Sequence, residues 1–152
     1  MSAIYNFYKV SDLLACAGQP REGQFASIAD EGYKVVINLG LADGRYALKD
    51  EAASVKSLGM EYHHIPVIFD NPQIEELTSF IDLMNKYADE KTFVHCAANY
   101  RASVFTGLYL YSAGKLDEHQ LEDFIDEIWK PEPIWETFIE DSVVFLKSSK
   151  NS

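Results

Sequence analysis

The chain has 152 residues, and 24 acidic against 13 basic side chains give it a net charge of −11 and a pI of about 4.7. Nucleic acids and anionic membrane surfaces are bound through clustered Lys and Arg, so we expect neither as a partner. The three arginines, Arg21, Arg45 and Arg101, lie far apart in the sequence. With 47% hydrophobic and 24% charged residues, the composition is that of one globular domain spanning 1–152.

Neither the start of the chain nor any later window resembles a membrane-targeting segment. No stretch approaches the roughly 18 uncharged apolar residues of a spanning helix, and no basic stretch followed by an apolar run opens the chain. We therefore expect a cytoplasmic protein. Its two cysteines, Cys16 and Cys96, show no disulfide or zinc spacing and are expected to be free thiols. The polar end, 146–152, is expected to fray.

Short β-type runs alternate with helical patterns along the chain. Strands are predicted at 13–16, 35–39, 61–67 and 92–95, with an edge strand within 4–10. Helices are predicted at 23–31, 50–58, 72–88, 100–114, 117–130 and 134–147, the third capped by Asn71. This order predicts an α/β fold: a mostly parallel sheet of four or five strands flanked by helices, with extra helices at the C-terminus.

The segment 92–116 contains no Asp or Glu, although the chain is strongly acidic. A small anion could bind there without repulsion. A strand followed by a buried helix would exclude carboxylates equally well. The sequence leaves both explanations open.

Within that segment, the predicted strand runs into His95 and Cys96. Four residues follow (Ala97, Ala98, Asn99 and Tyr100), and Arg101 then stands where a helix should begin. A strand-to-helix loop directs backbone N–H groups into a concavity at the positive end of the helix dipole, which favours an anion. Such a cradle and Arg101 would stabilise a Cys96 thiolate as a nucleophile. Arg101 offers a two-pronged donor, and Ser103 is expected to hydrogen-bond the sulfur.

The run HCAANYRAS at 95–103 resembles the signature of the cysteine-dependent protein tyrosine phosphatase superfamily. Three upstream elements occur in the matching order: CAGQP at 16–20, GYKVVINL at 32–39 and YHHIPV at 62–67. They are similar to a bacterial phosphatase-like family found beside beta-lactamase-like hydrolases. The resemblance covers about 18–112.

That resemblance implies a tyrosine-phosphatase-like fold and hydrolysis of a phosphate monoester, with no metal and no cofactor. Cys96 would be the nucleophile, Arg101 would bind the phosphoryl oxygens, and Asp70 would be the general acid, with Glu75 and Glu76 as substitutes. The phosphate-binding loop would comprise His95, Ala97, Ala98, Asn99, Tyr100 and Ser103, supported by Gln19 and Asn38. The partner would be a small phosphorylated substrate or a phosphoprotein.

Two departures from the superfamily pattern keep other functions open. The usual loop has five residues between Cys and Arg, whereas four stand here, and Gly40 occupies a position where related sequences often carry Arg. Rhodanese-like sulfurtransferases also have four residues between Cys and Arg, so a Cys96 persulfide is an alternative. A non-catalytic oxyanion-binding module is another.

For several further residues, a structural role is the simplest interpretation. His95 is expected to orient the loop through hydrogen bonds, and Tyr100 to line the site or pack in the helix. Cys16 is expected to be a core residue; the alternative is that it lies near Cys96 as a redox partner. Adjacent strand residues point to opposite faces, so His63 and His64 should not share a metal. Trp129 and Trp135 are expected to be anchors in the core.

Overall fold

The computed structural model describes residues 3–44 and 47–150. Its five strands form one sheet in the order β1-β2-β5-β3-β4, in which β1 pairs antiparallel with β2 and all other pairs are parallel. The strands are β1 (Tyr8–Ser11), β2 (Leu14–Ala17), β3 (Val35–Asn38), β4 (Glu61–His64) and β5 (Thr92–His95). The predicted α/β class is confirmed, and an edge strand is present as expected, although it spans Tyr8–Ser11 instead of lying within 4–10.

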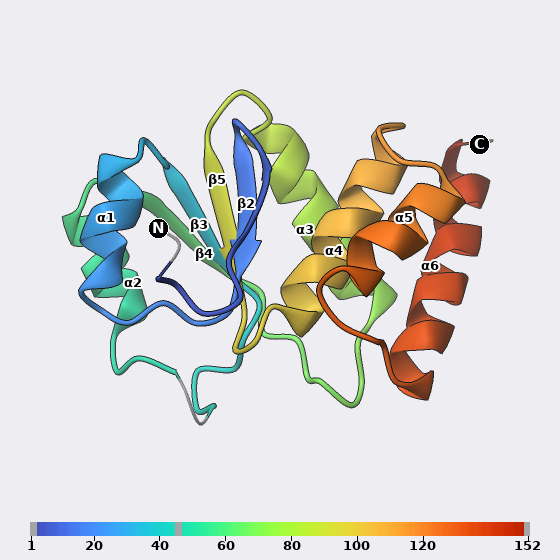
Figure 1. Ribbon diagram of the computed structural model, residues 1–152, viewed down its shortest axis with the longest axis horizontal. Coiled ribbons are helices and arrows are strands. Elements are labelled where there is room, and N and C mark those ends of the chain that lie inside the picture. The colour runs from blue at the N-terminus through green and yellow to red at the C-terminus, as the bar shows by residue number, and fades with distance from the viewer. Residues whose placement is uncertain (1–2, 45–46, 151–152) are drawn as a thin grey trace.

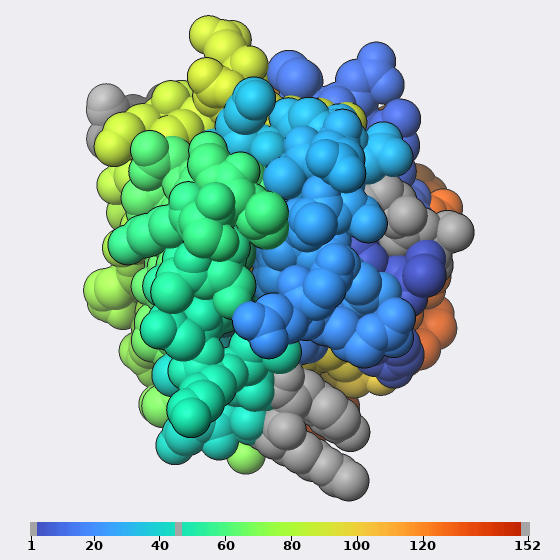
Figure 2. Space-filling view, turned by 90° about the vertical axis from the view of Figure 1, so that its left-hand side faces the viewer, coloured from blue at the N-terminus to red at the C-terminus, as the bar shows by residue number. Residues whose placement is uncertain are grey.

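Helices cover both faces of the sheet (Figure 1). On one side lie α1 (Gln24–Asp30) and α2 (Glu51–Ser57), and Figure 2 views the molecule from this side. On the other lie α3 (Ile74–Lys86), α4 (Tyr100–Ser112), α5 (Glu118–Asp126) and α6 (Pro133–Lys150). The helices after α4 are the predicted C-terminal additions.

Successive residues of the central strands point into two different cores. In β3, Val35 and Ile37 join the larger cluster beneath α3 to α6, whereas Val36 joins the smaller cluster beneath α1 and α2. Parallel strands covered on both faces read as continuous apolar runs for this reason. The same alternation sends His95 and Cys96, which follow one another at the end of β5, to opposite sides of the sheet.

The central helix of the larger layer is α4, which is buried along most of its length. Every residue from Arg101 to Leu110 is buried, and α3, α5 and α6 all contact this helix. Burial therefore accounts for the absence of carboxylates across 92–96 and 101–110, and that absence is not by itself a sign of an anion site.

Several other predicted boundaries need correction, and helix α5, which ends at Asp126 instead of 130, is one of them. Strand β4 ends at His64 instead of continuing to 67. Helix α3 is capped at Gln73, whose N–H donates to Glu76 Oε1 at 2.9 Å, while the N–H of Asn71 bonds Ile68 O and is still part of a turn. Helix α6 continues to Lys150 through the segment predicted to fray, because apolar residues such as Leu146 remain in the core. Residues 151–152 lie outside the described part of the chain.

Candidate active site

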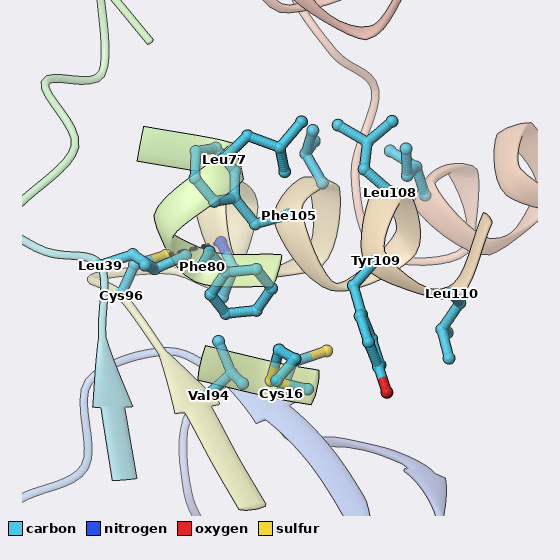
Figure 3. Close-up of a cluster of buried hydrophobic side chains, with 14 of the residues drawn as sticks. Cys16, Leu39, Leu77, Phe80, Val94, Cys96, Phe105, Leu108, Tyr109 and Leu110 are labelled. Atoms are coloured by element: carbon cyan, nitrogen blue, oxygen red, sulfur yellow. Dashed lines mark hydrogen bonds between the residues drawn. The ribbon is translucent and has the colours of Figure 1, made fainter. Parts of the chain in front are cut away.

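Cys96 lies at the carboxyl end of the parallel strands, between β5 and α4. Its side chain is only 1% exposed, and its Sγ accepts a hydrogen bond from the N–H of Ala102 at 3.4 Å (Figure 3). Its own N–H donates to Ala17 O on the neighbouring strand at 3.3 Å. The start of the loop is thus hydrogen-bonded to strand β2, and its end is the first turn of α4, which donates a hydrogen bond to the sulfur.

The carbonyl groups of the loop are held from outside by the N-terminal part of the chain. Gln19 N donates to Ala97 O at 3.0 Å, and Asn6 Nδ2 donates to Ala98 O at 2.9 Å. Asn99 adopts a left-handed conformation (φ 70°) and returns a bond from Nδ2 to Asn6 O at 3.0 Å. Asn6 was not singled out from the sequence, since nothing local links it to a loop more than 90 residues away.

The carbonyl oxygens of Ala97 and Ala98 are hydrogen-bonded to the N-terminal part of the chain and, within the described part of the structure, several backbone N–H groups of the loop remain as free donors. No acceptor among the described residues takes the backbone N–H of Ala97, Ala98, Tyr100 or Arg101. The last two belong to the first turn of α4, where N–H groups have no partner within the helix. Successive free N–H groups at a helix N-terminus form a concave anion site. The four-residue loop therefore retains the donors that an oxyanion needs.

Gly18 allows the end of β2 to approach this loop. A Cβ at Gly18 would stand 2.8 Å from Ala97 O and 3.0 Å from Tyr5 O, both of them backbone atoms that cannot easily give way. Any side chain here would push the N-terminal segment away from the loop.

Arg101 is 8% exposed and donates from Nη1 to Val67 O at 2.7 Å. Its Nε is buried without a partner, and no described hydrogen bond uses Nη2. Nε and Nη2 form the side of a guanidinium that binds two oxygens of an anion at once. Arg101 therefore keeps that two-pronged side free while its other nitrogen anchors it.

Beneath the loop lies a buried carboxylate that sequence reasoning missed. Glu51, 6% exposed at the start of α2, accepts from Gln19 Nε2 at Oε1 (2.7 Å) and faces His95 Nε2 with Oε2 (2.6 Å). Burial raises the pKa of Glu51, but hydrogen bonds from His95, Gln19 and Tyr62 outweigh burial and leave that pKa below its ordinary value. Its position four residues before the buried Val55 was the available signal, because such residues share one helix face.

The structure connects Gln19 and Asn38 to this region in different ways. Gln19 reaches the loop through its backbone and Glu51 through its side chain. Asn38 donates from Nδ2 to Tyr62 OH at 3.0 Å and accepts from Gly40 N at 2.8 Å. A Cβ at Gly40 would lie 3.8 Å from Cys96 Cα, so the position without Arg in this chain does adjoin Cys96.

Asp70 lies on the segment that follows β4. This segment is tied to the site by the Arg101 bond to Val67 O and by Trp135 Nε1, which donates to Phe69 O at 2.8 Å. Asp70 itself is exposed and makes no hydrogen bond to any described residue. Of the proposed substitutes, Glu75 is exposed and Glu76 is engaged at the start of α3. Asp70 and Glu75 thus both lack a described hydrogen bond, and Asp70 is the one that lies on the segment tied to Arg101 and Trp135.

One predicted contact of the loop is wrong, and Tyr100 takes the packing role that was one of its two predicted alternatives. Ser103 does not reach the sulfur: its Oγ donates to Tyr100 O at 2.9 Å, one turn back in the helix. Tyr100 stacks on Trp129 with ring centroids 4.5 Å apart and an interplanar angle of 10°. Phe69, from the segment that carries Asp70, packs against Tyr100, Trp129 and Trp135. Both tryptophans are therefore core anchors that dock the C-terminal helices beside the loop.

Cys16 is fully buried on β2, in the same cluster as Cys96 (Figure 3). Burial raises its pKa to about 12, and the neighbouring Cys96 adds to this effect while a hydrogen bond with Asn99 opposes it. At neutral pH Cys16 keeps its proton. Both cysteines are free thiols.

The described residues hold no group of three or more His, Cys, Asp or Glu placed to bind a metal ion. His63 and His64 have separate partners, Tyr87 OH and Gly40 O. In the same part of the chain, each helix is too short or too polar to cross a bilayer.

The sheet order, the covering helices and the cysteine loop before α4 define a protein tyrosine phosphatase-like fold. The structure of PTPMT1 shares this fold at a TM-score of 0.79, with 14% identity over 95% of this chain and 98% of that one. Pseudomonas aeruginosa TpbA matches at 0.68, with 18% identity over 95% of this chain and 84% of that one. At such identities the likeness concerns the fold alone.

A crystal structure of a DUF442 protein from Shewanella putrefaciens CN-32, described as a candidate phosphatase, is much more similar. The TM-score is 0.87 and the identity 30%, over 95% of each chain. The chain therefore belongs to the DUF442 family of phosphatase-like proteins.

Two curated relatives are both called beta-lactamase hydrolase-like proteins. That of Agrobacterium fabrum is 30% identical over 76% of this chain, and that of Xylella fastidiosa strain Temecula1 is 25% identical over 74%. The match spans only 27% of each relative. No protein-family model matches the chain. The resemblance to a phosphatase-like family associated with beta-lactamase-like hydrolases is thereby confirmed.

Proposed function

We propose that this chain hydrolyses phosphate monoesters through a thiophosphate on Cys96. The observation that carries the proposal is the free side of Arg101, which faces no described partner although Nε is buried, on a loop whose N–H groups also lack acceptors. Buried donors without partners are unfavourable unless a ligand completes them. A tetrahedral dianion would satisfy both sets of donors.

In the first step Cys96 reacts as a thiolate, its proton having passed to water. The sulfur attacks phosphorus in line, an S–P bond forms, and the bond from phosphorus to the leaving oxygen breaks. Asp70 donates a proton to that oxygen, so the alcohol departs neutral. Arg101 and the loop N–H groups hold the remaining phosphoryl oxygens and the charge they gain.

In the second step water attacks the thiophosphate. Asp70, now a carboxylate, takes a proton from the water as the new O–P bond forms and the S–P bond breaks. Inorganic phosphate leaves, and the Cys96 thiolate is restored. Electrons and atoms balance over the two steps with no oxidant, reductant or further reactant.

The charge of the chain favours some substrates over others. With a net charge of −11, the surface repels acidic partners at low ionic strength. A small phosphorylated molecule, or a phosphoprotein with basic residues around the phosphate, fits this field best. Nucleic acids and anionic membranes are disfavoured on the same ground.

The direct test compares the wild-type chain with Cys96→Ser on p-nitrophenyl phosphate and a panel of alkyl and aryl phosphates. The variant should lose turnover but still bind inorganic phosphate or vanadate in calorimetry, since the donors of the loop remain. Cys16→Ala is the matched control and should retain turnover. Turnover by Cys96→Ser at the wild-type rate would exclude the mechanism.

Sulfur transfer is a second candidate, favoured by the spacing of four residues between Cys96 and Arg101. The Cys96 thiolate would take the outer sulfur of thiosulfate and release sulfite, and cyanide would then remove that sulfur as thiocyanate. Incubation with thiosulfate and cyanide tests this reaction. Thiocyanate release without ester hydrolysis would favour a sulfurtransferase. Oxyanion binding with neither activity would identify a binding module.

A further inference from the structure

The pair formed by Glu51 and His95 lies directly beneath the nucleophile, on the opposite side of the sheet from the Cys96 side chain. We infer that Glu51 is a positioning residue, which holds His95 as a doubly protonated ring whose positive charge supports the Cys96 thiolate and the loop. The predicted effect of Glu51 on turnover rests on the proposed function of this loop.

Hydrogen bonding determines where the protons of this pair lie. Glu51 Oε2 is 2.6 Å from His95 Nε2, and Oε1 accepts from Gln19 Nε2. An ionised carboxylate can only accept, so Nε2 carries a proton. On the other side of the ring, Nδ1 lies 3.3 Å from Cys96 O, which is again an acceptor. A ring with protons on both nitrogens satisfies both contacts, whereas a neutral ring satisfies one.

The surroundings of His95 make this charge depend on Glu51. The ring is 0% exposed and otherwise faces the rings of Phe25 on α1 and Phe93 on β5, which carry no formal charge. The third polar group on Glu51 is the hydroxyl of Tyr62 from β4. A buried cation without a partner is strongly unfavourable. If Glu51 loses its charge, His95 should therefore release a proton.

The charge has a direct path to the nucleophile. His95 precedes Cys96 in the chain, and its Nδ1 faces the carbonyl of the residue that bears the sulfur. The positive member of the pair is thus the one in contact with the Cys96 backbone, whereas the described hydrogen bonds of Glu51 join it to His95 and Gln19. An opposite charge close to an ionisable group favours its charged form. The pair should increase the fraction of Cys96 present as thiolate in mildly acidic solution.

Glu51→Gln tests the inference because it removes the charge and keeps the shape. In protein labelled with ¹⁵N histidine, the wild-type His95 ring should show two N–H protons at pH 7 and the variant one. Signals are assigned by their loss in His95→Asn. The rate of Cys96 alkylation by iodoacetamide at pH 6, followed by mass spectrometry, should fall about tenfold in Glu51→Gln and approach the wild-type rate at high pH. Glu122→Gln, an exposed change of the same kind on α5, should leave both readouts unchanged.

Two further variants keep the test decisive if Glu51→Gln folds poorly in a thermal melt. Glu51→Asp retains the charge and should restore part of the alkylation rate. Tyr62→Phe removes one hydrogen bond to Glu51 and should lower the rate by a smaller factor. Two ring protons on His95 together with an unchanged alkylation profile in Glu51→Gln would overturn the inference.

Neither readout depends on ester hydrolysis. If the wild-type chain hydrolyses no phosphate ester but both readouts respond, the proposed function fails and the role of Glu51 stands. If hydrolysis is present, kcat/KM of Glu51→Gln should fall more at pH 6 than at pH 8, because the thiolate forms without help at the higher pH.

Discussion

Arg101 Nη1 donates to the carbonyl oxygen of Val67 at 2.7 Å, which joins the nucleophile loop to the segment carrying Asp70. This one bond fixes the plane of the guanidinium and leaves its Nε side free. The bond also holds the segment after β4 close to Arg101 at Val67. In the proposed mechanism, anion binding by Arg101 and proton donation by Asp70 would therefore be coupled through this bond.

Replacing Arg101 by Lys should separate charge from geometry. Lysine keeps the positive charge but cannot bond Val67 O and two oxygens of an anion together. We expect kcat/KM on aryl phosphates to fall by about 100-fold, the usual loss for one donor to developing charge. Calorimetry with vanadate should show weaker binding. Arg21→Lys is the exposed control, and an equal loss in it would show that the effect is not local.

Asp70→Asn should impair substrates according to their leaving groups. An amide cannot donate a proton to the leaving oxygen, so alkyl phosphates should lose about 10²- to 10³-fold in kcat. A p-nitrophenyl leaving group needs little protonation and should be affected less. Asp82→Asn, exposed on α3, is the control. Equal losses on both substrate classes would mean that Asp70 is not the acid.

Gly18→Ala should disturb the loop without touching a reacting group. The new Cβ would stand 2.8 Å from Ala97 O and force the N-terminal segment and the loop apart. We expect a lower melting temperature and weaker vanadate binding. Gly23→Ala is well matched, because nothing lies within 4 Å of its added Cβ. Similar melting of the two variants would contradict the close approach described here.

Glu51 should make stability depend on acid pH. Its pKa in the folded chain lies below the ordinary value of 4.5, so the unfolded chain binds this proton first. The stabilisation is therefore complete above about pH 4.5 and is lost as the pH falls through the folded-state pKa. Urea unfolding from pH 7 to pH 3 should show the difference between wild type and Glu51→Gln shrinking towards acid. A constant difference would mean that the carboxylate contributes no pH dependence.

The two cysteines should differ sharply in reactivity. Cys16 is fully buried within β2 and holds its proton up to a pKa of about 12, whereas Cys96, itself only 1% exposed, lies after β5 at the start of the loop before α4. Iodoacetamide at pH 8 should modify Cys96 alone in the folded chain, and both residues in urea. Peptide mass spectrometry distinguishes the two sites. Modification of Cys16 in the folded chain would show that β2 opens readily.

Local patterns determined most of the fold. The apolar runs at Val35–Asn38 and Thr92–His95 identify buried parallel strands, and the helices follow from periodicity and capping residues. Both signals arise between residues a few positions apart, so a single sequence contains them. The spacing from Cys96 to Arg101 likewise predicted an anion-binding loop with Cys96 as its nucleophile, and that prediction awaits the tests above. The cap of α3 escaped because Asn71 and Gln73 are both plausible starts, and a turn closed by Ile68 decides between them.

The tertiary structure alone decided what supports that loop. Asn6 lies 92 residues before Ala98, and Glu51 lies 44 residues before His95, so neither partnership leaves a local trace. The exclusion of Ser103 from the sulfur depends in the same way on the direction of one hydroxyl within α4. The sequence thus determined which residues can do chemistry, because their types and spacing are local. Long-range packing decided which of them are buried, paired and charged, because those properties depend on neighbours that only folding supplies.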